Sequence, residues 1–583
     1  MNRRLANGCT GALIAAIIPV GFAGWAAFVN PWFMDELGSY LLFVVSPWLV
    51  LGGFFGALMR GGGAWKTRRH VLAFLGLMGV MLGSHIRPTP DAVSTKLLVF
   101  GVDGATWDVM DRLSLPAFES LKENGAWGVL RSSEPMFSPL LWTSMATGEV
   151  PDEHGIHGFR TQATDCRSGR FWDVASEEGW SVGLYKWLVT WPPAPLPAGG
   201  FVVPSWLAGQ PDTWPSELSF IKEIELSRRL KRKRVEQVRP TWRLVLSGVR
   251  QGLRWSSLRK GATWMVRERL TDVVPAERAW RLQLLRVWMD RDVFVAQVHR
   301  HEPDLATFTT YATDALAHTH WELMETCNDG GDCPPWGRAV PDAYQQADVV
   351  LEEVVALLGD DAHVLVVSDH GFRAFSEEDL GRNFVPTTER LRERIRAEIG
   401  PVDVARLGHK LTVSFDDEVV SKVALVEWLD ALTQASTGKS FYRWEAIPNS
   451  VGALGLTLRD ERMDAQRHAS DAVGGEPISN YAALTPPYTG EHDIDGVVLA
   501  AGPAVPLGGL VSDASLLDVA PTVLALMGLP ASKEMSGRVL WGDEMPRVDS
   551  YDHLSPAEVA SPERTDVEAD VNTEQLRALG YIE

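Results

Sequence analysis

Apolar runs that end in acidic turns constrain the fold more than any other feature of this sequence. Residues 96–104 end in Asp-Gly, and residues 363–371 end in Ser-Asp-His-Gly. Runs of this length, bounded by glycine, are typical of strands that are buried inside a parallel sheet. Residues 305–311 and 496–503 are further runs of the same kind. We therefore expect four buried parallel strands, with polar side chains at the ends of several of them.

Helical patterns separate these runs, for example at residues 341–358. Buried strands that alternate with helices predict an α/β fold with a doubly wound, mostly parallel sheet. Such sheets bind ligands at the carboxyl ends of their strands, where the acidic residues lie. Two prolines at positions 88 and 90 indicate a linker, so we expect this domain to occupy residues 91–583.

The first ninety residues predict a separate membrane segment. Residues 5–29, 39–59 and 70–86 are apolar on all sides. A helix needs about 20 residues to cross a hydrocarbon layer of about 30 Å, and the third run, with about 17, is the shortest. A cleaved signal peptide would explain one run but not three. We therefore expect a three-helix transmembrane anchor at residues 1–90.

The charges that flank these runs predict the orientation of the anchor. Arg3 and Arg4 precede the first run, and the loop after the second run holds Arg60, Lys66, Arg68 and Arg69, whereas the loop between them is acidic. Positive loops stay in the cytoplasm. Three crossings of the cell (inner) membrane then place the domain at residues 91–583 in the periplasm or elsewhere outside the cytoplasm, whereas two crossings would leave it inside.

The net charge of −20 argues against nucleic acid as a partner of the whole chain. Residues 217–292 differ, with nineteen Lys and Arg against nine Asp and Glu. This basic helical insert also contains several tryptophans: Trp242, Trp255, Trp264, Trp280 and Trp288. Three interpretations stay open: a surface that lies on the membrane, a cap that attracts a phosphorylated substrate, or a solvated helical excursion with packed tryptophans. Residues 382–483 form a second insert.

Cysteine is scarce, and one pair is close in the sequence. Cys327 and Cys333 lie six positions apart. Outside the cytosol this pair can close a small disulfide loop, and in the cytosol two free thiols are expected. Both alternatives stay open.

Carboxylates and imidazoles gather at the predicted strand ends. Asp103 ends the first strand, and Asp369 with His370 ends the second, while His492 stands just before the last. A spacing of four puts two further residues on one face of a helical turn, Asp314 and His318. Mixed His and carboxylate ligands suit two divalent metal ions, with zinc favoured and manganese compatible. A pair of such ions supports phosphoryl transfer to a hydroxyl held between them.

The order of several motifs resembles one known family. Gly-Val-Asp-Gly at residues 101–104 precedes Ser-Pro-Leu-Leu-Trp-Thr-Ser-Met-Ala-Thr-Gly at 138–148 and Pro-Asp-Glu-His-Gly-Ile at 151–156. This order resembles the type I phosphodiesterase/nucleotide pyrophosphatase branch of the alkaline phosphatase superfamily. More closely, it resembles the bacterial group of predicted phosphohydrolases or phosphomutases. The resemblance covers most of residues 95–330, 345–375 and 485–583 and leaves the basic insert and the second insert outside.

The resemblance implies an alkaline phosphatase-like fold and a role for each candidate residue. Ser138 would be the nucleophile and would form a covalent phosphoseryl intermediate. One metal ion would be held by Asp103, Asp369 and His370. The other metal ion would be held by Asp314, His318 and His492.

Departures from the family pattern limit the expected substrates. Nucleotide pyrophosphatases usually have asparagine three positions after the nucleophile, where this chain has Leu141, which weakens the expectation of a nucleotide substrate. Sulfatases need proline and arginine at a fixed spacing, and here Pro139 comes one place early and the arginine is missing. His154 and His157 flank a glycine turn, and we interpret both as structural.

These observations predict a metal-dependent hydrolase of phosphate mono- or diesters. The substrate would be a phosphorylated small molecule, lipid or glycan outside the membrane. One alternative is a transferase that passes the phosphoryl or head group to a lipid or glycan acceptor. The other is a catalytically silent membrane scaffold, against which the complete ligand set argues.

Overall fold

A mixed eight-stranded sheet forms the centre of the catalytic domain. The computed structural model describes residues 3–33, 37–51, 93–159, 161–232, 241–374, 384–407, 410–416, 419–446, 452–459, 471–484, 489–542 and 545–556. The order of the strands across the sheet is β18 (Gly509–Ser515), β2 (Gly125–Arg131), β17 (Asp495–Ala501), β6 (His363–Val367), β1 (Leu97–Val102), β5 (Leu305–Thr310), β3 (Val182–Tyr185) and β4 (Gly200–Val203).

The direction of one strand differs from the prediction. Strands β6, β1 and β5 are parallel to one another, as expected, and two further parallel strands that were not predicted, β3 and β4, follow β5. We predicted residues 496–503 as a further parallel strand, but β17 runs antiparallel to both of its neighbours, β2 and β6. Because of this reversal, the beginning of β17 lies at the same edge of the sheet as the carboxyl ends of β1, β5 and β6.

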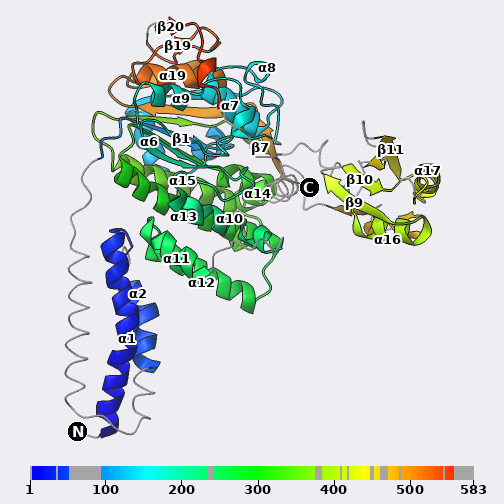
Figure 1. Cartoon of the computed structure of the whole chain (residues 1–583), viewed down its shortest axis with the longest axis horizontal. Coiled ribbons are helices and arrows are strands. Elements are labelled where there is room, and N and C mark those ends of the chain that lie inside the picture. Colours follow the sequence, from blue (N-terminus) through cyan, green and yellow to red (C-terminus); the bar gives the residue numbers. More distant parts are fainter. Residues whose placement is uncertain are drawn as a thin grey trace.

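Helices cover both faces of the sheet (Figure 1). Leu98 and Phe100 of β1 face one core, and Leu97 and Val99 face the other, because successive strand residues point to opposite sides. The first core is completed by α6 (Pro116–Glu123), α10 (Ser219–Arg232), α13 (Pro275–His301), α14 (Ala312–Asn328) and α15 (Ala339–Val355). The second is completed by α7 (Ser138–Thr147), α9 (Phe171–Glu177) and α19 (Val519–Leu526).

The basic insert is helical, as its sequence predicts. It contains α10, α11 (Thr241–Arg250), α12 (Trp255–Leu270) and most of α13. Trp264 and Trp280 are buried and Trp255 is half-buried, whereas 60% of Trp242 is exposed. Most of the tryptophans in α11, α12 and α13 therefore pack on the domain, and of these only Trp242 projects far into solvent.

The second insert folds as a small lobe with its own apolar core. A four-stranded antiparallel sheet has the order β11 (Tyr442–Ala446), β12 (Ala453–Leu458), β10 (Lys410–Phe415) and β9 (Val402–Leu407), and α16 (Glu389–Glu398) and α17 (Lys422–Ala431) pack on it. The two ends of the lobe pair with each other, β8 (Phe384–Pro386) with β15 (Ala482–Leu484). The next pair toward the catalytic domain is β7 (Gly371–Ala374) with β16 (Gly490–Asp493).

At the N-terminus, α1 (Arg3–Val29) coincides with the first predicted spanning run. Of the second run, residues 39–51 are described, beginning in α2 (Leu37–Tyr40), and the third run lies outside the described residues. Within the described part of the chain, no helix meets the length and apolarity required to span a membrane. The side chains of Ala16, Val20 and Ala23 share a small core with Val249 of α11.

Cys327 and Cys333 form a disulfide, with their Cα atoms 5.0 Å apart. The bond closes the turn between α14 and α15. Of the two alternatives left open by the sequence, the structure has the closed loop.

Candidate metal and nucleophile site

The carboxyl edge of the sheet brings the predicted ligands together. Asp103 directly follows β1, Asp314 lies in the first turn of α14 just beyond β5, and Asp369 with His370 follows β6. β1 pairs with both β5 and β6, so their ends are neighbours. Three carboxylates therefore meet at one place, and each of them is at most 1% exposed.

His492 reaches the same place from the opposite chain direction. It lies in β16, which pairs with β7 so that His492 stands opposite Phe372. The chain then enters β17 at Asp495. Because β17 is antiparallel, a residue that precedes it joins residues that follow the parallel strands.

The atoms of the cluster lie within the range of a shared cation. Asp314 Oδ1 lies 3.3 Å from His318 Nε2, 3.2 Å from His492 Nε2 and 4.0 Å from His370 Nε2. His370 Nε2 lies 3.6 Å from Asp103 Oδ1 and 3.5 Å from Asp369 Oδ2. Two overlapping groups result, Asp103 with Asp369 and His370, and Asp314 with His370 and His492, and His370 belongs to both. His318, which the family pattern assigns to the second ion in place of His370, adjoins this group through its 3.3 Å approach to Asp314.

Backbone carbonyls orient all three imidazoles. The Nδ1 atoms of His318, His370 and His492 lie 3.3, 2.9 and 3.1 Å from the carbonyl oxygens of Gly490, Gly371 and Met136, respectively. A carbonyl only accepts, so each Nδ1 carries the proton and donates it. Each Nε2 then presents a lone pair to the cluster, which is the arrangement of metal-binding histidines.

The residues fit a pair of divalent cations. His318 Nε2 and His492 Nε2 are 3.1 Å apart, so their lone pairs would repel each other unless a cation lies between them. Asp314 Oδ1, His318 Nε2 and His492 Nε2 are separated by 3.1–3.3 Å. Two ligand atoms that each lie 2.0–2.1 Å from a tetrahedral zinc ion are about 3.3 Å apart, so the three atoms are spaced as zinc ligands are. Among the described residues, neither Asp369 Oδ2 nor His370 Nε2 has a hydrogen-bond partner.

Electrostatics point the same way. Burial would raise the pKa of Asp314, but positive charge and N–H donors at His318 and His492 hold it below its usual value, so this carboxylate favours a cation at the two Nε2 atoms, either protons or a metal ion. Burial, reinforced by the charge of Asp314, raises the pKa of Asp369 to about 7. Burial and the neighbouring His492 lower the pKa of His370 well below 6.5, so this imidazole is neutral. The cluster needs added positive charge before all its carboxylates ionise together.

Ser138 begins the helix that borders this cluster. It is the first residue of α7 and is fully buried. Two residues before it, the carbonyl of Met136 accepts the hydrogen bond from His492. Four residues after it, the indole Nε1 of Trp142 donates a 2.9 Å hydrogen bond to Asp103 Oδ2. The chain on either side of Ser138 is thus bonded to a residue of each ligand group, and the N-terminus of α7 favours an anion.

Trp142 is a residue whose role the sequence reasoning missed. Its side chain is fully buried, and its own carbonyl accepts a 3.1 Å hydrogen bond from Trp187 Nε1. Gly101 of β1 makes room for its ring, since a Cβ atom there would lie 2.4 Å from Trp142 Cη2. Glycine inside a strand often marks such a close approach, and this was the available signal.

With this geometry in place, the comparisons with known proteins decide the family. The model of the type I phosphodiesterase/nucleotide pyrophosphatase family matches residues 97–442. The chain belongs to this family. It is therefore a member of the alkaline phosphatase superfamily and a hydrolase that acts on phosphoric ester bonds. The matched range includes Ser138 and all of the predicted ligands except His492.

Two solved structures match this chain over about three quarters of its length. Human ectonucleotide pyrophosphatase/phosphodiesterase 5 is 13% identical, with 76% of this chain and 97% of that chain covered and a TM-score of 0.37. The murine protein of the same name, an inactive variant in complex with AMP, is 14% identical, with coverages of 75% and 96% and a TM-score of 0.35. No curated protein sequence matches the chain.

The structure shows the surroundings of the residues that depart from the family pattern. Leu141 is fully buried in the second core, so no amide stands at its position. His154 is buried against Ser144 Oγ at 3.0 Å, and burial lowers the pKa of His154 to about 3. His157 is exposed. Neither histidine belongs to the two ligand groups at the carboxyl edge.

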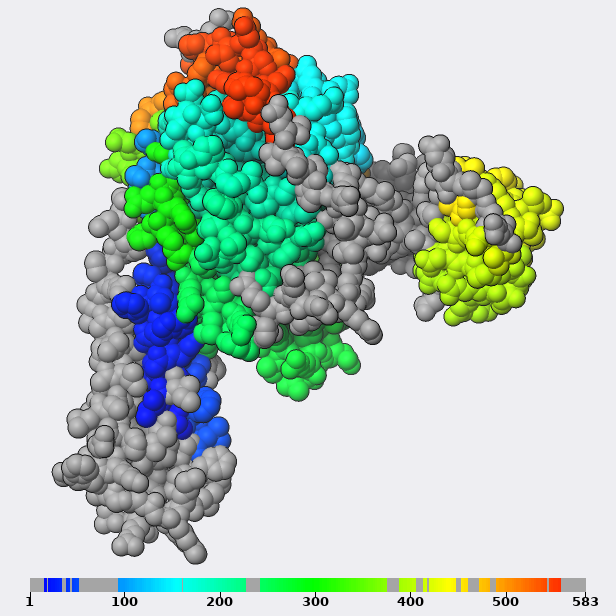
Figure 2. Space-filling view, in the orientation of Figure 1, coloured from blue at the N-terminus to red at the C-terminus, as the bar shows by residue number. Residues whose placement is uncertain are grey.

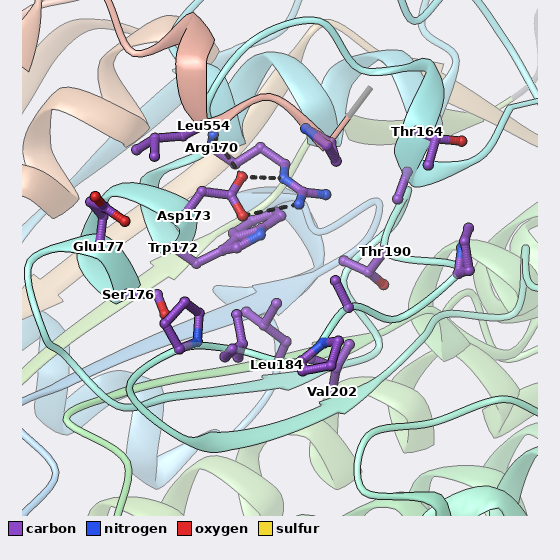
Figure 3. A pocket seen from close by; sticks show the side chains of 17 residues that line it. Thr164, Arg170, Trp172, Asp173, Ser176, Glu177, Leu184, Thr190, Val202 and Leu554 are labelled. Atoms are coloured by element: carbon purple, nitrogen blue, oxygen red, sulfur yellow. Dashed lines mark hydrogen bonds and ion pairs between the residues drawn. The ribbon is translucent and has the colours of Figure 1, made fainter. Parts of the chain in front are cut away.

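Two cavities lie outside the cluster. One of about 170 Å³ lies against α9, where Arg170 forms an ion pair with Asp173 beside Trp172 (Figure 3). The other, of about 250 Å³, lies between α10, α12 and α13 and reaches Lys186, which follows β3. None of the seven predicted site residues lines either cavity.

Proposed function

We propose that the chain is a metal-dependent phosphohydrolase that cleaves phosphate mono- or diesters through a phosphoseryl intermediate on Ser138. The observation that carries this proposal is the convergence of three buried carboxylates and three imidazoles, with all three Nε2 atoms within 4.0 Å of Asp314 Oδ1. Burying carboxylates without cations is unfavourable, so an apolar cluster would stabilise the fold better than this set does. The set is therefore explained by binding cations and not by a purely structural role.

The ligand set favours two divalent metal ions. Asp103, Asp369 and His370 would hold one ion, and Asp314, His318 and His492 would hold the other. His370 lies 4.0 Å from Asp314 and is therefore close to the second group as well. Zinc suits the mixed nitrogen and oxygen donors, and manganese is compatible with them. When bound, the ions supply positive charge to a phosphoryl group and lower the pKa of the attacking hydroxyl.

The chain itself supplies the nucleophile and its placement. Ser138 stands at the N-terminus of α7, where the helix dipole stabilises an anionic oxygen. Its hydroxyl would attack the phosphorus, the ester oxygen would leave with a proton, and water would then hydrolyse the phosphoserine. The bonds made by Met136 and Trp142 would hold the backbone of Ser138 beside both ligand groups for this attack.

The proposed substrate is a phosphorylated small molecule, and the alternative is a phosphate ester of a lipid or a glycan. Leu141 removes the amide that binds a phosphate oxygen in nucleotide pyrophosphatases, which argues against nucleotides. The proposed location is the cell (inner) membrane, with residues 1–90 as anchor and the catalytic domain in the periplasm or elsewhere outside the cytoplasm. The Cys327–Cys333 disulfide supports an oxidising compartment.

A matched pair of serine variants tests the mechanism. Ser138→Ala should lower turnover of aryl phosphate mono- and diesters by at least about 10³-fold and leave the bound metal unchanged. Ser144→Ala changes another buried serine of α7 and should keep turnover within about tenfold. A chelator should abolish activity, and added Zn²⁺ or Mn²⁺ should restore it.

Three results would contradict the proposal. Equal turnover by Ser138→Ala would exclude this nucleophile, and full activity in excess chelator would exclude the metal. Phosphorylated acceptor as the main product, in assays that contain an alcohol or a lipid, would replace hydrolysis with transfer.

A reporter fused after residue 90 tests the proposed location. It should be active outside the cytoplasm, and activity only in the cytoplasm would overturn the proposed location.

A further inference from the structure

Helices α11 and α12 carry a charge opposite to that of the chain. Between residues 241 and 286, ten Lys and Arg stand against three Asp and Glu, a net charge of +7 within a chain of −20. Some of these cations are neutralised locally, since Arg267 contacts Glu277 at 2.8 Å and Arg278 contacts Glu268 at 3.0 Å. The buried Arg254 is paired with Glu353, outside the segment, at 2.7 Å. Seven cations still stand against one carboxylate after these three pairs are discounted, so this segment attracts anions.

Large apolar side chains are exposed on the same helices. Met265 and Val266 of α12 are 53% and 56% exposed, and Leu270 at its end is 77% exposed. Val266 and Leu270 are four residues apart and share one face of the helix, with Arg269 beside them. On α11, Trp242 is 60% exposed. Clustered exposed apolar side chains among cations indicate a partner with both apolar and anionic character.

The helices are fixed beside the N-terminal segment. Asn30 Nδ2 donates to the carbonyl of Leu253 at 2.9 Å, and the backbone N–H of Trp255 donates to the carbonyl of Phe33 at 2.8 Å. The rings of Trp255 and Tyr40 meet edge to face at 4.8 Å. The turn between α11 and α12 therefore rests on the end of α1, and both views of the molecule place these green helices beside the blue ones (Figures 1 and 2).

We propose that Met265, Val266, Arg269 and Leu270 of α12, the basic apolar face, bind the surface of an anionic phospholipid bilayer, together with the exposed Trp242 of α11. Apolar side chains enter the boundary between head groups and acyl chains, and tryptophan favours that boundary. Each arginine or lysine near an anionic surface raises the partition coefficient about fivefold. This contact fixes the orientation of the catalytic domain above the lipid and is separate from any anchoring by α1.

A fluorescent label tests this contact on the full-length chain in vesicles. The label NBD is attached to Leu270→Cys in a Cys9→Ser background. The matched control carries the same label on Leu507→Cys. Leu507 is 79% exposed and lies on the distant turn before β18. In vesicles with 30% phosphatidylglycerol, the label at 270 should be shielded from aqueous iodide and quenched by lipid nitroxides. It should be exposed in pure phosphatidylcholine and in high salt, and the label at 507 should be exposed throughout.

A charge variant adds a second readout. Arg269→Glu changes the local charge by two, so the partition coefficient of this face, obtained by titrating the shielding at 270 with anionic vesicles, should fall about 25-fold. Turnover of a soluble aryl phosphate should stay unchanged, which separates this surface from the catalytic site.

Several outcomes would overturn the proposal. Equal exposure of the two labels in anionic vesicles would show that the basic apolar face does not touch lipid. Equal shielding at 270 in neutral and anionic vesicles would remove the role of charge. Shielding that needs no vesicles and rises with protein concentration would identify the partner as a second copy of this acidic chain.

Discussion

Replacing Trp142 with phenylalanine separates the support of the metal site from the stability of the core. The substitution removes the 2.9 Å hydrogen bond from the indole to Asp103 Oδ2 and keeps an aromatic ring in the core. A hydrogen bond to a charged group contributes about 1.5–3 kcal/mol, which corresponds to a change of about 10- to 100-fold in an equilibrium constant. Groups that orient metal ligands change metal affinity by a similar factor. We therefore expect zinc to bind about 10- to 100-fold more weakly.

Titration calorimetry of the metal-depleted chain measures this change directly. Trp172→Phe is the matched control, because Trp172 is equally buried in the same core and stacks near Arg170 rather than against a ligand. Both variants should unfold at lower denaturant concentration, but only Trp142→Phe should lose metal affinity. If the two variants lose stability equally and bind zinc as tightly as the parent, the indole does not orient Asp103 and the reasoning is refuted.

Three further predictions follow from the packing and the charges. Gly101→Ala places a Cβ atom 2.4 Å from Trp142 Cη2, so urea unfolding should show a loss of about 1–3 kcal/mol, and an unchanged midpoint would contradict the close contact. Cys333→Ser opens the short loop to Cys327, which should cost about 2 kcal/mol by chain entropy, whereas chemical reduction should destabilise the parent and leave the variant unaffected. Burial, opposed by its Ser168 hydrogen bond, raises the pKa of Glu149 from 4.5 to about 7, so its contribution to stability is complete below pH 4.5 and lost as pH rises through 7. Glu149→Gln should therefore stabilise the chain by up to about 3 kcal/mol at pH 8 and by nothing at pH 4, and an equal gain at both pH values would refute the titration.

The sequence predicts the parallel strands because a continuous apolar run can only be buried on both faces. It does not predict the direction of β17, since an apolar run reads alike in either orientation. That reversal explains how His492, which precedes a strand, joins Asp103 and Asp369, which follow theirs. Residue type and strand ends thus predicted which side chains meet, and the chain path had to come from the structure.

The surroundings of the predicted ligands carry little signal in the sequence. The carbonyl groups of Met136, Gly371 and Gly490 orient the imidazoles, and a backbone carbonyl is present at every position. Likewise, nothing in residue type assigns His370 a place near both ligand groups. Such details depend on distances of a few tenths of an ångström, which motif spacing does not fix.

The second insert also shows where sequence reasoning stops. Its boundaries were predicted as 382–483, and the structure has paired strands at 384–386 and 482–484. Its antiparallel sheet was not predicted, because the short strands β9–β12 are stabilised by pairing with distant partners rather than by local pattern. The fold of a small lobe therefore follows from contacts that a linear reading does not contain.

The place where this lobe joins the catalytic domain has a consequence for how such enzymes diversify. The chain leaves immediately after His370 and returns through β16, which carries His492, and β7 and β16 close the gap as a ladder of backbone hydrogen bonds. Any module whose own termini lie side by side would fit on this ladder without displacing either histidine. Exchange of the module at this one junction would leave the ligand cluster in place, so the lobe could change by recombination without rebuilding the site.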